Sequence, residues 1–288
     1  MSLRSDFTPV FLLGAGRSGT KFLRSLLSVS EDVNVIPFDV GYVWRYKNER
    51  VPHDEFTKEM ATEDVTKYVR KTLPTLVCDK HKNAKILIEK SVPNSLRPEF
   101  VHAIYPDAKF IHLIRDGRAV TESAIRLWKE PTSKKYLLKK LKYFPWSNYR
   151  YGFWYLGNMV RGKFLSCRGQ QIWGPRYIGM DYDVRNLPLE SVCARQWKKC
   201  IETCSGQLKF INPVNVLEVR YENLVKDHYE LLRIGAFLGL SDIERVVKEF
   251  EATCNIDNLK KWEKTLDDYI LHNILKEIEP TLTDLGYL

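Results

Sequence analysis

Residues 10–22 read VFLLGAGRSGTKF, an apolar run followed by three glycines, an arginine and two hydroxyl-bearing side chains. The apolar run is typical of a buried strand, and residues 18–30 are typical of a helix with Leu23, Leu26 and Leu27 on one face. A strand, a glycine turn and a helix in this order bring together unpaired backbone amides and the positive end of the helix dipole. The stretch therefore predicts an anion-binding loop at the carboxyl end of a strand.

Two nucleotide-binding patterns partly fit this loop. Residues 14–19 match the dinucleotide pattern G-x-G-x-x-G, and Asp39 follows at a spacing that would let it hold a ribose hydroxyl. The mononucleotide P-loop needs a hydroxyl directly after its lysine to bind magnesium, whereas Phe22 follows Lys21 here. This order disfavours a nucleoside triphosphatase and leaves the dinucleotide alternative resting on a short glycine pattern.

The basic residue of the loop stands ahead of its last glycine. Arg17 can make a two-pronged contact with phosphate or sulfate oxygens, and Ser18 and Thr20 add hydroxyl donors. A glycine such as Gly19 lets the backbone approach an anion closely. The side chains of the loop thus favour a phosphate or sulfate group as its ligand.

Apolar strands alternate with helical segments along most of the chain. Strands are predicted within residues 8–16, 33–38, 84–96, 109–115 and 213–225, and helices within 18–30, 53–73, 97–108, 117–128 and most of the remainder. This alternation predicts an α/β fold, a P-loop-like three-layer arrangement with a central parallel sheet flanked by helices. Residues 129–190 break the rhythm, so we expect a single domain over 1–288 with an insertion there that carries the acceptor site.

Composition limits the class of partner. The 288 residues carry a net charge of +9, which favours an anionic ligand, and hydrophobic residues make up 44%, enough for a sizeable core. No signal peptide or membrane span is visible, so a cytoplasmic location is expected. The cysteines form no C-x-x-C pair, which predicts no metal site and reduced, mostly buried thiols at Cys78, Cys167, Cys193, Cys200, Cys204 and Cys254.

A second motif lies at residues 109–125, KFIHLIRDGRAVTESAI. Arg115 stands at the end of an apolar strand, and Ser123 follows eight residues later within the next helix. In a parallel sheet the strand ends and the helix starts line the ligand crevice, so these two side chains can converge on one small anion. Together with the first loop, the motif predicts a ligand that carries anionic groups at two places.

The pairing of GRSGTKF with IRDGRAVTES resembles the sulfotransferases that use 3′-phosphoadenosine 5′-phosphosulfate (PAPS). ILIEKSVPNSLR, FIHLIRDGRAV, WGPRY, ARQWKKCIE, VRYENLV and the closing LGYL also resemble segments of bacterial and tyrosylprotein-type members. The resemblance implies that the first loop binds the 5′-phosphosulfate and that the second motif binds the 3′-phosphate. The residues implied are Arg17, Ser18, Gly19, Thr20 and Lys21 for the first role and Arg115 and Ser123 for the second.

The resemblance also implies a catalytic set. Sulfuryl transfer is analogous to phosphoryl transfer, in which positioning and charge stabilisation dominate, and Arg17 and Lys90 are the predicted groups that stabilise the leaving oxygen without a metal. Cytosolic members place a catalytic histidine two residues after that lysine, where this chain has Val92. Tyrosylprotein-type relatives use a glutamate after the second strand. Asp39 is the only carboxylate of the corresponding VIPFDVGYVW, so it is the predicted general base.

Other residues have two interpretations each. As general bases, His53, His81 and His112 are rivals of Asp39, although His112 falls in an apolar strand and the others in polar stretches. Phe22 fits either an adenine-stacking residue or a helix core position. Lys260 and Lys261, within NLKKWEK, fit either phosphate contacts or a solvated helix face, and the lysine-rich run 134–142 fits either an acceptor guide or plain surface.

The sequence predicts a PAPS-dependent sulfotransferase. Its acceptor stays open among carbohydrate, peptide tyrosine, lipid and small molecule, with specificity expected in residues 40–60 and 129–190. No nucleic-acid partner is expected. Two alternatives remain: a P-loop small-molecule kinase and a non-catalytic nucleotide-binding or carbohydrate-binding protein.

Overall fold

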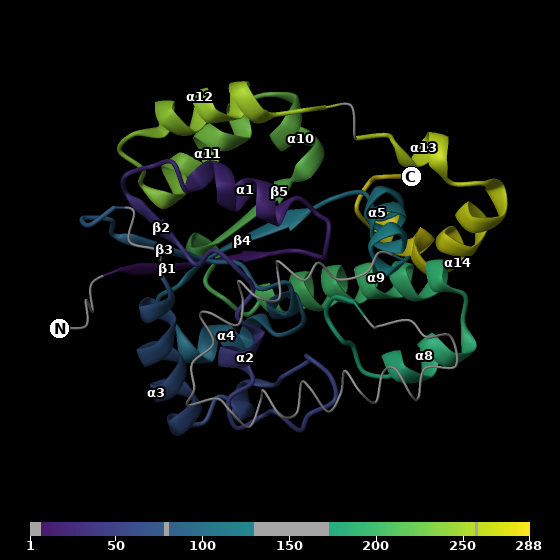
Figure 1. Cartoon of the computed structure of the whole chain (residues 1–288), viewed down its shortest axis with the longest axis horizontal. Helices are drawn as coiled ribbons and strands as arrows, with labels where there is room; N and C mark the ends of the chain where they lie inside the picture. Colours follow the sequence, from purple (N-terminus) through teal and green to yellow (C-terminus); the bar gives the residue numbers. More distant parts are fainter. Residues whose placement is uncertain (1–6, 78–80, 130–172, 257–258) are drawn as a thin grey trace.

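The computed structural model describes residues 7–77, 81–129, 173–256 and 259–288 (Figure 1). At its centre is a parallel sheet of five strands in the order β2-β3-β1-β4-β5. The strands are β1 (Thr8–Leu13), β2 (Val33–Val35), β3 (Ile86–Glu89), β4 (Lys109–Ile114) and β5 (Val216–Arg220). The prediction of an α/β fold around a parallel sheet is confirmed.

Strand β1 occupies the middle of the sheet, between β3 and β4. Its Phe11 is in register with Glu89 of β3, and its Leu13 is in register with His112 of β4. Because all the strands run the same way, the segments that leave β1, β3 and β4 emerge at one edge of the sheet. The first loop, the segment containing Lys90 and the second motif are therefore neighbours by topology.

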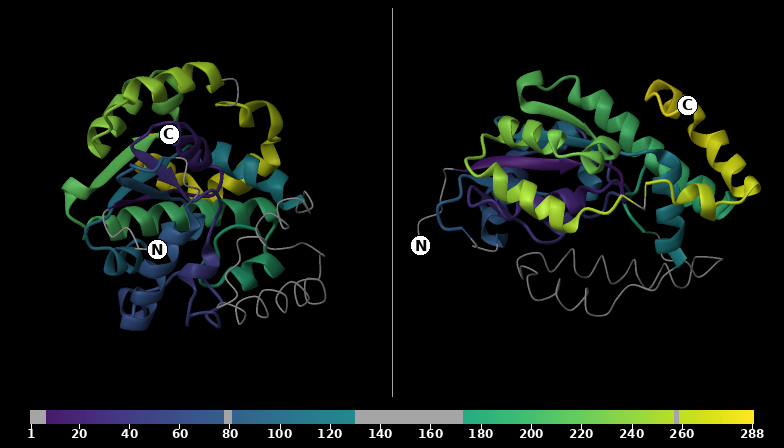
Figure 2. Two further views of the ribbon diagram at one scale, coloured as in Figure 1. Left: turned by 60° about the vertical axis from the view of Figure 1, so that its left-hand side comes forward. Right: turned by 90° about the horizontal axis from the view of Figure 1, so that it is seen from above.

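Helices cover both faces of the sheet (Figures 1 and 2). They are α1 (Thr20–Leu27), α2 (Gly41–Trp44), α3 (Glu63–Thr72), α4 (Pro98–Ile104), α5 (Gly117–Lys129), α8 (Met180–Asn186), α9 (Leu189–Leu208), α10 (Tyr221–Lys226), α11 (Tyr229–Leu238), α12 (Ile243–Thr253), α13 (Trp262–Thr265) and α14 (Asp268–Asp284). Short 3₁₀ helices are η1 (Lys58–Met60), η2 (Leu73–Leu76), η3 (Val92–Leu96) and η5 (Pro213–Asn215). In Figure 1, α1, α10, α11 and α12 lie above the sheet, and α2, α3 and α4 lie below it.

The apolar run of β1 supplies both faces of the core. Val10 and Leu12 pack with α1, α11 and α12, whereas Phe11 and Leu13 pack with the helices of the opposite face. A strand that is buried on both faces needs no alternation of polar and apolar residues, which explains the unbroken VFLL. A third apolar cluster joins α5, α9 and α14 and includes Trp197. It holds the helix of the second motif against the rest of the fold.

Several predicted boundaries shift in the structure. The helix expected over 53–73 is confined to α3 and the turn η1, because the residues before them are held by loop contacts: the Asp54 amide bonds to the Arg176 carbonyl. Most of the expected insertion at 129–190 lies outside the described residues, and its last part contains α8. Within the described ranges, no helix has the length and apolar character to cross a bilayer.

Candidate functional site

The first loop joins β1 to α1 and is held by two hydrogen bonds between Gly14 and Ser95. The Gly14 amide donates to Ser95 Oγ (2.9 Å), and the Ser95 hydroxyl donates to the Gly14 carbonyl (2.8 Å). A Cβ at Gly14 would lie 2.6 Å from the Leu113 carbonyl oxygen, so the loop needs glycine there. Arg17 and Gly19 take left-handed conformations, with φ of 77° and 95°. The resulting curve leads directly into the amino end of α1.

Two hydroxyls of this loop point inward. Ser18 is fully buried and Thr20 is 4% exposed, whereas the Arg17 and Lys21 side chains are exposed. Within the part of the chain that the structure describes, Ser18 Oγ has no hydrogen-bond partner. A buried hydroxyl without a partner costs on the order of 1–3 kcal/mol, so this atom fits a ligand oxygen. The loop therefore offers backbone amides, a buried hydroxyl and an exposed guanidinium to an anion.

The second motif lies against the first. Arg17 Nε donates to Ser123 Oγ (2.9 Å), and Arg115 Nη1 donates to the Arg17 carbonyl (3.1 Å). Ser123 stands in the second turn of α5, as expected, and its side chain is turned toward the loop rather than toward solvent. The structure brings these three residues together from segments about one hundred positions apart, at one edge of the sheet.

Two further residues join this group, Tyr221 and Arg126, neither of which was a predicted site residue. The Tyr221 ring lies 4.3 Å from the Arg115 guanidinium carbon, and the same ring blocks the space where a Cβ at Gly19 would lie. Arg126, one turn after Ser123, approaches its hydroxyl at 3.4 Å. VRYENLV supplied a signal for Tyr221, because a tyrosine at a strand end shares the edge used by Arg115.

Neighbouring segments fix the second motif in place. Glu222 Oε1 accepts from the Asp116 amide (2.9 Å), and its Oε2 accepts from the Tyr287 hydroxyl (2.8 Å). Trp197 Nε1 donates to the Arg115 carbonyl (3.1 Å). VRYENLV, ARQWKKCIE and LGYL thus meet around the start of α5 and position it.

The predicted general base and the predicted lysine contact each other. Lys90 follows β3 and Asp39 follows β2, and their side chains form an ion pair. The Lys90 side chain is 9% exposed and that of Asp39 is 30% exposed, so solvent reaches the pair from the carboxylate side. The pair lies at the edge of the sheet that also bears the first loop.

Directly behind this pair is a buried carboxyl group, Glu89. It is 2% exposed and accepts from the Ser91 hydroxyl and from Asn94 Nδ2. Burial, helped by the negative charge of Asp39, raises the pKa of Glu89 to about 7, against the lowering effect of the Ser91 hydrogen bond. No sequence pattern marks Glu89 as a functional residue, because a glutamate at the end of a short strand is usually exposed to solvent.

The three rival histidines occupy different surroundings. His112 is 1% exposed within β4 and is surrounded by core, as its apolar sequence context indicated. His81 is half-buried, and its backbone exchanges hydrogen bonds with the Asn34 side chain. His53 is also half-buried, and it lines a separate small pocket.

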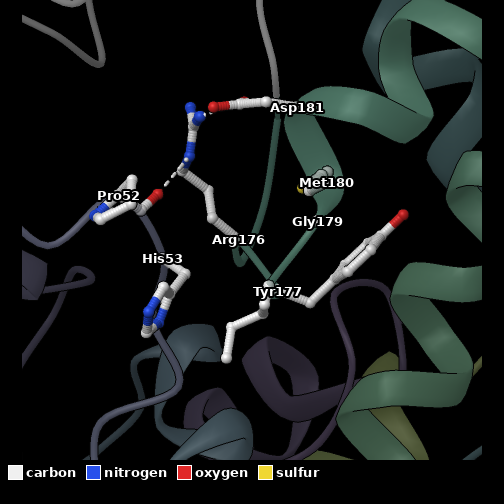
Figure 3. Close-up of a pocket in the computed structure, with 8 residues that line it drawn as sticks. Pro52, His53, Arg176, Tyr177, Gly179, Met180 and Asp181 are labelled. Atoms are coloured by element: carbon white, nitrogen blue, oxygen red, sulfur yellow. Dashed lines mark hydrogen bonds and ion pairs between the residues drawn. The ribbon is translucent and has the colours of Figure 1, made fainter.

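That pocket has a volume of about 150 Å³ and lies between residues 52–53 and residues 176–181 (Figure 3). Arg176 extends between its two walls, where it donates to the Pro52 carbonyl (3.0 Å) and pairs with Asp181. Among the described residues, His53 Nδ1 has no hydrogen-bond partner. A segment of WGPRY links this pocket to the anion loop, because the Trp173 ring lies against Gly16.

His112 gives the fold a specific sensitivity to acid. Burial lowers the pKa of this imidazole from 6.5 to about 4, so the unfolded chain takes up a proton first as pH falls. Stability should be lost between pH 6.5 and 4, by up to about 3 kcal/mol from this group. His112→Gln should remove that part of the pH dependence in urea unfolding at pH 7, 5.5 and 4. The exposed His272→Gln serves as the control, and an equal slope in both variants would contradict the assignment.

The remaining predicted residues divide between core and surface. Phe22 is partly buried and packs against the cluster that contains α1, which supports its core interpretation. Lys260 pairs with Glu263 (3.4 Å) on the surface. Lys261 caps the short helix α13, whose Trp262 lies beneath the Arg118 guanidinium of α5 (4.4 Å). The run 134–142 lies outside the described residues.

No group of three histidine, cysteine or carboxylate side chains within the described ranges is placed to hold an ion. The cysteines Cys193, Cys200, Cys204 and Cys254 carry free thiols, the first three of them buried; Cys78 and Cys167 fall outside the described ranges. The described side chains at the sheet edge carry guanidinium, ammonium, hydroxyl and carboxylate groups.

Comparison with known proteins gives consistent results. Residues 9–143 match the model of the Sulfotransferase family. The chain is 24% identical over 297 residues to a protein-tyrosine sulfotransferase of Drosophila melanogaster, covering 99% of this chain and 53% of the fly protein. It is 24% identical over 292 residues to protein-tyrosine sulfotransferase 1 of Danio rerio, covering 98% and 73%. The solved sulfotransferase domain of the Synechococcus PCC 7002 olefin synthase superposes with a TM-score of 0.52 at 17% identity over 97% of both chains, a similarity of fold.

Proposed function

We propose that this chain, as a sulfotransferase of the family whose model it matches, takes a sulfuryl group from PAPS and passes it to an acceptor hydroxyl. The observation that carries the proposal is the meeting of Arg17, Arg115 and Ser123 at one sheet edge, beside a buried Ser18 hydroxyl that has no partner among the described residues. Two adjacent anion sites suit a donor with anionic groups at both ends of its ribose.

The residues at this edge fit such a donor. Arg17, Ser18, Gly19, Thr20 and Lys21 would hold the 5′-phosphosulfate through backbone amides, hydroxyls and charge. Arg115 and Ser123 would hold the 3′-phosphate, and the exposed Arg126 is placed to add a third donor there. Lys260 and Lys261, on the segment that packs against the start of α5, remain candidates for a further phosphate contact.

Lys90 and Asp39 are the proposed catalytic pair. PAPS, when bound, supplies the sulfuryl group and a bisphosphate leaving group. The Lys90 ammonium and the Arg17 guanidinium would stabilise negative charge on the leaving oxygen, and Asp39 would accept the proton of the acceptor hydroxyl. The ion pair holds the two side chains next to each other at the sheet edge, where both roles are needed.

For the acceptor we propose a hydroxyl compound bound on the side of Trp173 and the pocket that contains His53 and Arg176. The segment 173–181 connects the two places: its Trp173 ring lies against Gly16 of the first loop, and its residues 176–181 line the pocket. A tyrosyl phenol is the first acceptor to test, because the Drosophila and Danio relatives are named for protein tyrosine. Carbohydrate and small-molecule hydroxyls are the next.

Adenosine 3′,5′-bisphosphate should raise the melting temperature of the protein without added metal. A ligand that binds only the folded state at one hundred times its dissociation constant stabilises that state by about 2.7 kcal/mol, which is a shift of several degrees. ATP with magnesium and NAD should give much smaller shifts. The measurement is a thermal melt with each ligand in turn.

The same melts discriminate between the alternatives. A larger shift with ATP and magnesium than with the bisphosphate would favour a small-molecule kinase, and a shift with NAD alone would overturn the sulfotransferase proposal for this loop. Binding of the bisphosphate with no transfer of ³⁵S-labelled sulfate to any acceptor class would point to a non-catalytic nucleotide-binding protein. We also propose that residues 1–288 form a single domain, which limited proteolysis of the bisphosphate complex can test.

A further inference from the structure

Glu89 occupies an unusual place for a carboxyl group. It is the last residue of β3, it is 2% exposed, and its register partner on β1 is the core residue Phe11. Its strand neighbour two residues back, Leu87, packs in the cluster that contains Phe11 and Trp44. The carboxyl group therefore stands at the rim of an apolar layer, directly beneath the proposed catalytic pair.

Hydrogen bonds connect Glu89 to the segment that carries Asp39. The Ser91 hydroxyl donates to Glu89 Oε1 and accepts from the Val40 amide (2.9 Å). Asn94 Nδ2 donates to Glu89 Oε2 (3.0 Å). With the Ser91 hydroxyl donating to Oε1 and Asn94 Nδ2 donating to Oε2, the ionised carboxylate of Glu89 accepts both bonds. Through Ser91, Glu89 is therefore connected to Val40, the residue that directly follows Asp39.

The charged and titratable groups around Glu89 come from four segments. Lys90 is its chain neighbour, Asp39 lies on the loop after β2, Tyr105 follows α4, and Arg97 donates through Nε to Asn94 Oδ1 (2.9 Å). Lys90 favours the ionised form of Glu89, whereas Asp39 and burial oppose it. Burial and the negative charge of Glu89 raise the pKa of Tyr105 to well above its ordinary value, so Tyr105 is neutral across the working range. Glu89 is thus the group of this cluster poised to change charge near neutral pH.

We propose that Glu89 is a positioning residue whose ionised carboxylate, acting through Ser91 and through its charge, holds Lys90 and Asp39 ready for sulfuryl transfer. This inference rests on the proposed function. Ionised Glu89 orders the Ser91–Val40 bond and adds a second negative charge next to the Lys90 ammonium. Transfer should therefore switch on as Glu89 ionises.

The test is the pH profile of kcat with PAPS and a tyrosine-containing peptide. Wild-type kcat should rise with an apparent pKa near 7, because burial raises the pKa of Glu89 to about 7. In Glu89→Gln this rise should disappear and kcat at pH 8 should fall about tenfold, with bisphosphate affinity unchanged within about twofold. In Ser91→Ala the rise should move to higher pH, since the lost hydrogen bond lowered the pKa of Glu89. Glu218→Gln, on the partly exposed β5, is the matched control and should keep the wild-type profile.

A purely structural role would lower the melting temperature of Glu89→Gln and leave the pH profile in place, which would overturn the inference. Infrared difference spectra of the wild-type protein between pH 6 and 8 give an independent readout. They should show a protonated carboxyl that is lost on titration and is absent from Glu89→Gln, and its absence from wild type would also overturn the inference. If wild type binds no bisphosphate and transfers no sulfate, the proposed function fails, and this role fails with it. If wild type transfers sulfate and Glu89→Gln keeps its profile, only the Glu89 inference fails.

Discussion

Replacing Lys90 with methionine should lower kcat about a thousandfold while leaving bisphosphate binding nearly intact. The ammonium is almost buried, lies at the end of β3 and pairs with Asp39, so it is fixed where a leaving oxygen at the sheet edge would develop charge. Removing one fixed donor of this kind costs roughly 10²–10³ in rate, and here the variant also leaves Asp39 without its cation. Methionine keeps most of the apolar stem, so the fold should persist. The measurement is single-turnover transfer of ³⁵S-labelled sulfate at saturating donor.

The matched control is Lys85→Met, just before the other end of the same strand. Lys85 is exposed, so its loss should change kcat by less than about twofold. Bisphosphate affinity, measured by calorimetry, should be unchanged in both variants, because neither substitution alters the first loop or the second motif. The measurement therefore separates donor binding from catalysis. A Lys90→Met enzyme that kept wild-type kcat would remove Lys90 from the mechanism and leave Arg17 as the charge-stabilising group.

The two motifs to which we assign anion binding could be recognised in the sequence because each is local. A strand, a glycine turn and a helix can be read from a dozen residues, and the Arg115–Ser123 spacing follows from a strand end and one helix. Their contact, from Arg17 Nε to Ser123 Oγ, depends on β1 and β4 being neighbours in the sheet. A parallel sheet places all the strand ends at one edge, but it does not say which strands are neighbours, so this contact could be read only from the structure.

The residues that pack against the first loop could not be predicted from the sequence. Tyr221 fills the space above Gly19, and Gln196 Nε2 holds the Trp173 carbonyl (2.9 Å) so that the Trp173 ring lies against Gly16. Each of these contacts joins separate segments of the chain. VRYENLV places Tyr221 at a strand end, but no spacing rule reveals which residues the tyrosine, glutamine and tryptophan side chains touch. The segments RYE, RQW and WGPRY were visible as family-like stretches, but only the fold shows that they brace the loops.

The Lys90–Asp39 ion pair changes how the catalytic prediction is understood. Sequence reasoning gave the two residues separate tasks, one for the leaving oxygen and one for the acceptor proton. In the structure each is the other's counter-ion, and Glu89 lies behind both. A proton that reaches Asp39 weakens its hold on Lys90 and leaves that ammonium more fully available to the leaving oxygen. The two proposed tasks are therefore coupled through one contact.

Gly19→Ala should raise the bisphosphate dissociation constant at least a hundredfold. Gly19 caps the amino end of α1 with φ of 95°, and a Cβ there would overlap Cδ2 and Cε2 of Tyr221. Tyr221 in turn lies against the Arg115 guanidinium, so moving its ring disturbs the first loop and the second motif together. A hundredfold loss corresponds to about 2.7 kcal/mol of binding free energy. Isothermal titration with adenosine 3′,5′-bisphosphate measures it directly.

Gly179→Ala is the control that separates the backbone strain of a left-handed alanine from the displacement of the Tyr221 ring. Gly179 caps the amino end of α8 with φ of 90°, nearly the conformation of Gly19, but a Cβ there would meet no atom of the described chain within 4 Å. Both variants carry the left-handed penalty of about 1–2 kcal/mol in stability, and only Gly19→Ala also displaces an aromatic ring. Bisphosphate affinity should therefore stay within about twofold of wild type in Gly179→Ala. Equal losses of affinity in the two variants would mean that the effect comes from general destabilisation, and Tyr221 would then have no part in shaping the anion site.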